Sequence, residues 1–257
     1  MLSSLVSIHY YPVKSLSFSS LDICTIKKNI GIVNDRLFSI TRHINFEKAK
    51  LVEKYPKQRS LNHFLTLKNS PFLNKYKFYY NGKILSLRQG SKKIISISDD
   101  YEKYNLICNK LINLEKSISS PIFLLKNKKY PFFDTTHSKK IFNTISLINI
   151  NSIRDLEKKT NEKIEFDRFR GNFYFDGLAA WKERTWLNKI IKINNISFKV
   201  LKNIERCSAI NLMPNTDKIT INLPLSLKKL YNHIDMGVYL EALEDGEINI
   251  GDKITIN

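Results

Sequence analysis

The chain has 257 residues, a length that suits one large domain or two small ones. Hydrophobic residues make up 42% and charged residues 26%, which allows a sizeable core and argues against a disordered chain. Eight glycines and seven prolines exclude collagen-like and linker-dominated architectures. No stretch reaches the ~18 uninterrupted apolar residues of a membrane span, and the first residues lack the pattern of a secretory signal. We therefore expect a soluble, unprocessed, cytoplasmic protein.

The chain is strongly basic, with 42 Lys and Arg against 24 Asp and Glu and a formal net charge of +18. Such a surface attracts polyanions and acidic proteins. Nucleic-acid binding is not expected, because the sequence has no zinc finger, no RGG tract and no basic recognition helix. The abundance of Lys, Asn and Ile is also typical of A+T-rich coding, so composition alone is an alternative source of the charge. Three scattered cysteines, Cys24, Cys108 and Cys207, are too few for a disulfide framework and indicate a reducing compartment.

Short alternating apolar segments dominate the first half of the chain. Residues 6–10 and 21–25 alternate between apolar and polar side chains, a pattern that predicts strands with one buried face. An Asn-Gly pair between β-prone runs predicts a hairpin over 77–87. Residues 101–114 carry apolar side chains at helical spacing and predict a helix.

The second half adds two short helices to further strands. Ser152 begins a capping-box pattern and predicts a helix start there. Pro224 predicts a second start, with Leu227 and Leu230 pointing inward. Residues 248–256 predict a closing hairpin. Because strands outnumber helices and follow one another in meander order, we expect a mainly β fold with a few helices, of the α+β class, built as a barrel or a sandwich.

Four short clusters combine charged and polar side chains, at 11–15, 35–36, 167–172 and 205–207. Taken singly, each has a structural explanation: a solvated turn, a surface ion pair, the outer face of a strand, or a small buried thiol. Taken together, Lys14, Arg36 and Arg170 offer charge-assisted donors that suit an anionic phosphate ester. Cys207 follows Arg206, and a cationic neighbour favours a thiolate, which is a soft metal ligand.

Common enzyme motifs are missing from the sequence. It contains no GxGxxG, GxxxxGK[ST], HExxH or GxSxG pattern, and its five histidines show no paired ligand spacing. Three cysteines cannot supply the four thiolates of a common iron–sulfur cluster. The clusters described above therefore remain the main candidates for chemistry.

In their order along the chain, these clusters resemble the MOSC family, named for the C-terminal domain of molybdenum cofactor sulfurase. The matching segments are YPVKS, GIVNDR, SLINI with NSIRDLE, DRFRGNFYFDG, W-x₄-W, ERC and GVYLEAL-x₂-GEINIGD. The resemblance implies a smaller β-rich N-terminal MOSC β-barrel domain over residues 1–120 and a MOSC-type β-barrel domain over 121–257. Within the family, the chain is most similar to bacterial relatives of the mitochondrial amidoxime-reducing component.

The resemblance also implies a cofactor, a molybdenum ion carried on a pyranopterin dithiolene. Cys207 matches the family's metal ligand and is the implied catalytic residue. The implied cofactor-binding residues are Lys14, Ser15, Arg36, Asn149, Arg170, Asn172 and Arg206. The family often has Arg-Pro-Asn where this chain has Arg170-Gly171-Asn172, and glycine permits the same turn with less rigidity.

The implied function is a molybdenum-dependent oxidoreductase that reduces N-hydroxylated compounds such as amidoximes and hydroxylamines. The sequence ends without ferredoxin-type cysteines, so we expect electrons from a separate acidic flavoprotein, ferredoxin or cytochrome, for which the +18 charge would be a docking surface. One alternative is a carrier of the molybdenum cofactor or of sulfur, without reductase turnover. Another is a non-catalytic basic β-barrel that binds RNA through exposed aromatic residues.

Overall fold

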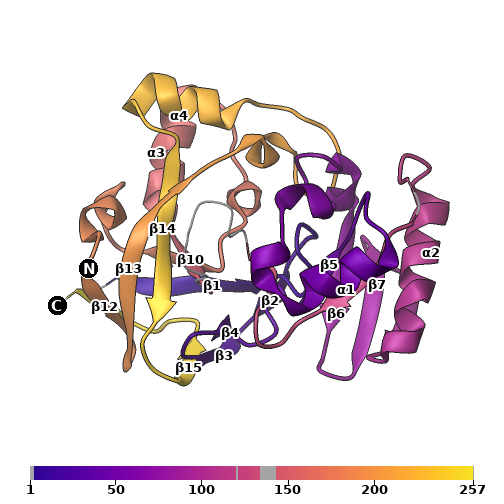
Figure 1. The fold of residues 1–257 in the computed structure, drawn as a ribbon. Coiled ribbons are helices and arrows are strands. Elements are labelled where there is room, and N and C mark those ends of the chain that lie inside the picture. Colours follow the sequence, from indigo (N-terminus) through magenta and orange to yellow (C-terminus); the bar gives the residue numbers. More distant parts are fainter. Residues whose placement is uncertain (1–2, 120, 134–142, 257) are drawn as a thin grey trace.

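The computed structural model describes residues 3–119, 121–133 and 143–256 (Figure 1). Within these ranges it has four α-helices and sixteen strands. The helices are α1 (Phe46–Lys54), α2 (Tyr104–Leu114), α3 (Ile150–Thr160) and α4 (Leu223–Tyr231). None of them is both long and apolar enough to span a lipid bilayer.

The largest sheet has eight strands in the order β16-β12-β13-β14-β10-β11-β1-β2. In chain order they are β1 (Ser4–Tyr10), β2 (Ser19–Leu21), β10 (Ile145–Asn149), β11 (Phe173–Asp176), β12 (Ile190–Ile193), β13 (Ile196–Glu205), β14 (Asp235–Ala242) and β16 (Ile254–Ile256). An isolated bridge between Ser4 and Lys253 links β1 to the segment before β16, together with hydrogen bonds from the Leu5 N–H to the Asp252 carbonyl at 2.9 Å and from the Gly251 N–H to the Leu5 carbonyl at 2.8 Å. The α+β class is therefore confirmed, whereas the described ladders do not close into the expected barrel.

Three smaller sheets complete the fold. They are formed by β15 (Gly246–Asn249), β3 (Ile23–Lys27) and β4 (Gly31–Ile32), by β5 (Phe38–Ile40) and β9 (Leu124–Lys126), and by β6 (Tyr76–Tyr80), β7 (Ile84–Gln89) and β8 (Lys92–Ser98). The predicted hairpin of β6 and β7 is confirmed, with Tyr80 opposite Leu85. The predicted closing hairpin is wrong, because β15 pairs with β3 while β16 pairs with β12.

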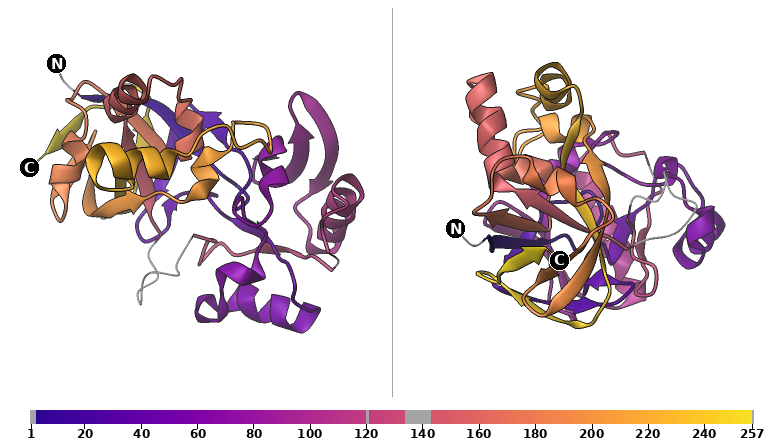
Figure 2. Two further views of the ribbon diagram at one scale, coloured as in Figure 1. Left: turned by 90° about the horizontal axis from the view of Figure 1, so that it is seen from above. Right: turned by 90° about the vertical axis from the view of Figure 1, so that its left-hand side faces the viewer.

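Two large hydrophobic cores, accompanied by two smaller clusters, organise the described part of the molecule. One lies among α2 and β5–β9, and the other lies among the strands of the large sheet and β3, β4 and β15. Figure 2 shows the corresponding arrangement, with the violet and magenta segments on one side and the orange and yellow segments, joined by indigo β1, on the other. Leu5 and Ile8 of β1 are buried in the second core. The division into 1–120 and 121–257 stays a prediction, and the first strand packs with the later half.

Two strands bury different residues from those the alternation predicted. In β1, Ile8 and Tyr10 are buried as predicted, but the register shifts between Leu5 and Ser7, so Leu5 is buried and Val6 is 39% exposed. In β3 the buried side chains are Cys24 and Ile26, one residue out of phase with the predicted face. A bulge adds one residue to one strand and thereby reverses the faces beyond it, which local alternation cannot reveal.

The helix predictions hold with shifted ends. α3 begins at Ile150 with Asn149 as its N-cap, and Ser152 is not the cap: its hydroxyl is buried and donates to Glu183 at 2.8 Å. α4 begins beside Pro224 as predicted, but Leu230 is 42% exposed. The apolar residues of one helix can extend beyond the surface that packs against it. Helical spacing in the sequence therefore does not show which of these residues are buried.

Candidate functional site

The loop after β1 is fixed against the turn that contains Arg36. The backbone N–H of Arg36 donates to the Tyr11 carbonyl at 2.7 Å, and the Lys14 N–H donates to the Phe38 carbonyl at 2.9 Å. The Tyr11 N–H in turn donates to Oδ1 of Asp35 at 2.7 Å. These bonds bring the first two sequence clusters into one substructure, although about twenty residues separate them.

Asp35 is the buried anchor of this substructure. It is 1% exposed, and its carboxylate forms an ion pair with Arg36 and accepts from Nδ2 of Asn172 at 3.1 Å. Burial raises the pKa of Asp35, and the Arg36 guanidinium opposes that rise. The reading of this pair as a surface contact of little value is therefore wrong, because the ion pair lies in the protein interior.

Arg36 and Arg170 meet at the ring of Tyr11. Their guanidinium carbons lie 4.2 Å and 4.7 Å from the ring centroid, within the range of cation–π attraction. Arg170 also donates to the Leu16 carbonyl at 2.8 Å, and burial lowers its pKa. Lys14 donates to the Phe132 carbonyl at 3.4 Å. The structure thus brings all three predicted cations to the loop after β1.

Three of the predicted site residues have a strained backbone. Ser15, Arg36 and Arg170 have φ values of 69°, 50° and 52°, in the left-handed region. In the described part of the chain, only five residues other than Gly and Asn have such φ values, and three of them are these predicted site residues. Each costs on the order of 1–2 kcal/mol, and strain of this kind gathers at functional sites. The backbone therefore supports a functional role independently of the charges.

Three other predicted site residues have their polar atoms engaged by the protein itself. Asn172 is 1% exposed; its Oδ1 accepts from the Ser146 hydroxyl at 2.9 Å and its Nδ2 donates to the His9 carbonyl at 3.1 Å. Asn149 caps α3 and donates to the Ala179 carbonyl at 2.8 Å. Arg206 donates from Nη1 to the Phe169 carbonyl at 2.7 Å and from Nε to the Met236 carbonyl at 2.9 Å. These side chains position the backbone of the site, and their contact with a cofactor stays a prediction.

Gly171 occupies the place where the family often has proline. Its N–H donates to the Tyr174 hydroxyl at 2.9 Å, a bond that proline cannot make. A Cβ built at Gly171 would lie 2.7 Å from Cδ1 of Ile148 and 2.9 Å from Cζ of Tyr174, so a side chain would require both neighbours to shift. The turn is therefore fixed by a hydrogen bond and by packing, not loosened by the glycine.

Cys207 lies at the surface, where β13 ends. It is exposed, and its residue is the N-cap of the short 3-10 helix η7 (Ser208–Asn211). Cys24 and Cys108 are buried, and burial raises the pKa of each thiol to about 12. Cys207 is thus the one cysteine of the three whose thiol is open to a ligand. The described residues contain no group of three or more His, Cys, Asp or Glu side chains arranged to hold a metal.

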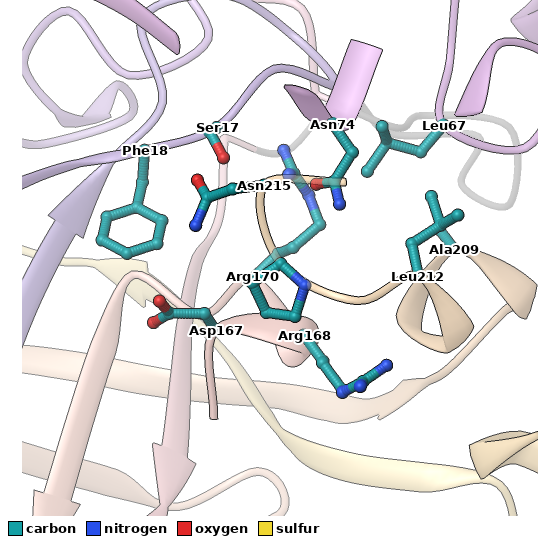
Figure 3. Close-up of a pocket in the computed structure, with 11 residues that line it drawn as sticks. Ser17, Phe18, Leu67, Asn74, Asp167, Arg168, Arg170, Ala209, Leu212 and Asn215 are labelled. Atoms are coloured by element: carbon teal, nitrogen blue, oxygen red, sulfur yellow. The ribbon is translucent and has the colours of Figure 1, made fainter. Parts of the chain in front are cut away.

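Two small pockets adjoin the predicted residues. The first, here called the Asp167 pocket, has about 340 Å³ of empty space (Figure 3). Its lining comprises Ser17, Phe18, Leu67, Asn74, Asp167, Arg168, Arg170, Ala209, Leu212, Pro214 and Asn215. The second has about 260 Å³ and is lined by Lys14, Arg59, Ser60, Leu61, Phe64, Phe132 and Phe133. Arg170 therefore faces the first pocket and Lys14 the second, while Cys207 enters neither lining, although η7 contributes Ala209.

Sequence reasoning named Tyr11, Asp35 and Asp167 only as parts of clusters and gave them no role. The signal for Tyr11 was its place in YPVKS, directly after a predicted strand, where a large aromatic ring can be shared by incoming cations. For Asp35 the signal was an acid next to an arginine after a tight turn. Asp167 stood beside two arginines, and only the fold shows that it faces a pocket.

We expect His9 to make the stability of the fold depend on pH. Burial lowers its pKa from 6.5 to about 4, and its Nδ1 has no partner among the described residues. Because the unfolded chain then binds more protons, stability should fall as the pH drops from 6.5 to 4, by up to about 3 kcal/mol. His9→Gln should lose less stability across that window, measured by urea unfolding at several pH values. His43→Asn is the control, and identical pH profiles for wild type and His9→Gln would contradict the assignment.

Comparison with known proteins finds one family model and several distant relatives, each matching about half of the chain. Residues 134–255 match the family model of the MOSC domain. The chain is 23% identical over 159 residues to mitochondrial amidoxime reducing component 2 of Bos taurus, covering 56% of this chain and 46% of that protein. It is 25% identical over 115 residues to the Homo sapiens protein of the same name, covering 40% and 34%. The matches thus span less than half the length of these relatives.

Solved structures give more distant likenesses. The YUAD protein of Bacillus subtilis aligns with a TM-score of 0.45 and 11% identity, over 99% of this chain and 94% of that one. YiiM of Geobacillus stearothermophilus aligns with a TM-score of 0.36 and 17% identity, over 44% and 53%. The sequence motifs and the family model agree on the later half of the chain. The chain therefore carries a MOSC domain match over residues 134–255.

Proposed function

We propose that this protein is a molybdenum-cofactor-binding oxidoreductase that reduces N-hydroxylated compounds. The observation that carries the proposal is the gathering of Lys14, Arg36 and Arg170 at one loop, on a strained backbone, in a chain whose one exposed cysteine follows β13. The MOSC match and the similarity to amidoxime reducing components support the choice of cofactor and reaction class.

The donor set has the chemistry that a phosphate-bearing metal cofactor requires. Guanidinium and ammonium groups bind phosphate oxygens through charge-assisted hydrogen bonds, and a thiolate is a soft ligand for a metal. Arg36 and Arg170 would hold the anionic tail, Lys14 and Ser15 would add donors at its edge, and Cys207 would ligate the metal. When bound, the cofactor would supply the two-electron redox chemistry.

The protein residues would then orient and enclose this group. The Asp35 ion pair fixes Arg36, and the ring of Tyr11 keeps the two arginines close despite their like charge. Asn172 joins the Asp35 turn to β10 through Ser146. A site held by buried hydrogen bonds loses little freedom on binding, and such preorganisation raises affinity.

Electrons would come from a separate redox protein. The net charge of +18 favours an acidic partner, such as a flavoprotein, a ferredoxin or a cytochrome, because opposite charges accelerate encounter at low salt. The rate of electron delivery by such a partner should therefore fall as the salt concentration rises.

Metal analysis and turnover test the proposal together. Protein produced in cofactor-sufficient cells should contain about one molybdenum per chain and should reduce benzamidoxime with an artificial reductant. Molybdenum without reduction of any compound in a broad panel of N-hydroxylated substrates would favour a cofactor carrier or sulfur-transfer protein. Neither molybdenum nor turnover would overturn the proposal and favour RNA binding, which filter binding would detect.

Arg170→Ala should reduce the molybdenum content by about tenfold while the protein stays folded, because it removes a phosphate-binding guanidinium. The loss of the bond to Leu16 and of the Tyr11 contact should cost only about 1–3 kcal/mol of stability. Elemental analysis and thermal melting of the same samples measure both effects. Arg154→Ala, at an exposed ion pair, is the control, and full metal retention in Arg170→Ala would contradict the assigned role.

A further inference from the structure

The segment that carries Cys207 reaches from one hydrophobic cluster of the molecule to another. In residues 207–220, here called the Cys207 segment, Ile210 lies in the small cluster that includes residues of α3 and α4. Leu212 is 3% exposed and lies in the large core among α2 and β5–β9, and Ala209 packs against that same core. Figure 3 shows Leu212 on the side of Leu67, which comes from the first half of the chain. A segment within the MOSC match therefore completes the core of the first half.

Asn74 holds the turn that follows Leu212. It lies in the 3-10 helix η3 (Pro71–Lys75) and is 7% exposed. Its Nδ2 donates to the Met213 carbonyl at 2.9 Å and to the Thr216 carbonyl at 2.8 Å. The Thr216 N–H donates to the Met213 carbonyl at 3.1 Å, so the Asn74 side chain bonds to both ends of one turn. An amide has two N–H donors, and both are used on the Cys207 segment.

Two cations hold the Cys207 segment at other points. The Nζ atom of Lys75, in η3, lies 3.3 Å from Oδ2 of Asp217. Arg168 is 5% exposed and donates from Nη1 to the Asn211 carbonyl at 3.1 Å and from Nη2 to Oγ1 of Thr220 at 2.9 Å. The segment is therefore fixed from both halves of the chain.

The turn that Asn74 holds lies close to Cys207 along the chain. Only residues 208–212 separate Cys207 from Met213, and four of them form η7. On the other side of Cys207, the Arg206 N–H donates to the Ile234 carbonyl at 2.9 Å. A functional group must be held within about 0.5 Å of its productive position by the residues that support it. A displaced Met213 turn should therefore displace the thiol.

We propose that Asn74 is a positioning residue for Cys207, through which the first half of the chain sets the place of the thiol. The inference rests on the proposed function only for the identity of the metal that the thiol would bind. The coupling itself is supported by the two hydrogen bonds of Asn74, by the burial of Leu212 and by the Lys75 ion pair.

Hydrogen exchange tests this coupling in protein purified without cofactor. In Asn74→Ala the amides within residues 212–216 should exchange about 10- to 100-fold faster, as expected when two buried hydrogen bonds are lost. The amides of β14 should change much less, which separates local loosening from a loss of global stability. Asn74→Asp keeps the size of the side chain but removes both donors, and it should loosen the segment as Asn74→Ala does.

Thiol alkylation and metal analysis connect the turn to Cys207. In Asn74→Ala, iodoacetamide should alkylate Cys207 at least about threefold faster, because a looser segment exposes the thiol more fully. Mass spectrometry assigns the product, and the thiols of Cys24 and Cys108 are buried. Protein from cofactor-sufficient cells should contain about tenfold less molybdenum per folded chain, an effect common for residues that support metal ligands.

Asn127→Ala is the matched control. The Nδ2 atom of Asn127 donates to the Glu53 carbonyl at 2.6 Å, so this change also removes an amide-to-carbonyl bond from the first half of the chain. It should lower the melting temperature and leave segment exchange, Cys207 alkylation and molybdenum content unchanged. If melting shows that Asn74→Ala does not fold, Asn74→Ser, which keeps one hydroxyl donor, is measured in its place.

Wild-type exchange and alkylation rates in both Asn74→Ala and Asn74→Asp would overturn the inference. So would faster exchange of the segment combined with a wild-type alkylation rate and full molybdenum retention. Faster exchange and alkylation in a protein that takes up no molybdenum and reduces no amidoxime would leave the inference standing and remove the proposed function.

Discussion

Cys207→Ser is expected to lower the molybdenum content by at least about tenfold and to abolish amidoxime reduction, while the fold is retained. Serine offers a hard hydroxyl in place of a soft thiolate. Mutation of residues that only support the metal ligands commonly lowers metal affinity by about 10–100-fold, so loss of a direct ligand should lower it at least as much. The residue is exposed at the N-terminal end of η7, so the change leaves the core intact. Elemental analysis, turnover and thermal melting on one preparation measure the three effects.

Cys24→Ala and Cys108→Ala are the matched controls for this experiment. Both thiols are buried in hydrophobic cores, so these changes should lower stability by creating small cavities and should leave the molybdenum content per folded chain unchanged. Molybdenum that survives in Cys207→Ser and disappears in Cys108→Ala would show that the ligand has been wrongly chosen.

Asp35→Ala is expected to destabilise the protein by about 3–5 kcal/mol, which is the range for breaking a buried ion pair by removing one partner. The change would remove the carboxylate that the Arg36 guanidinium, the Tyr11 N–H and the Asn172 amide all contact. Since native stability is commonly only 5–15 kcal/mol, the variant should be partly unfolded at 37 °C. Urea unfolding followed by circular dichroism gives the free-energy change.

Asp35→Asn and Asp245→Ala are the comparison variants for Asp35→Ala. Asparagine keeps an acceptor for the Tyr11 N–H, so Asp35→Asn should cost less than Asp35→Ala. Asp245 pairs with Lys27 on an exposed surface, so Asp245→Ala should leave stability nearly unchanged. Equal effects of Asp35→Ala and Asp245→Ala would show that Asp35 is not the anchor of the turn.

The sequence by itself determined the elements whose cause is local. The Asn-Gly turn fixes the β6–β7 hairpin, and Pro224 fixes the start of α4. Motif order predicted a MOSC domain, and the family model matches it over residues 134–255, which include Arg170 and Cys207. A turn or a helix start depends on a few neighbouring residues, so the local sequence contains the necessary information.

Only the tertiary structure decided what depends on distant partners. The bulge in β1 buried Leu5 in place of Val6, the last two strands joined two different sheets, and Asp35 became a buried anchor. The same holds for the Asp167 pocket, whose walls come from segments that are far apart in the chain. Burial and pairing are set by long-range packing, which competes with local preference and often overrides it. For that reason the meeting of Arg36 and Arg170 at the Tyr11 ring could be hypothesised from the sequence but not placed by it.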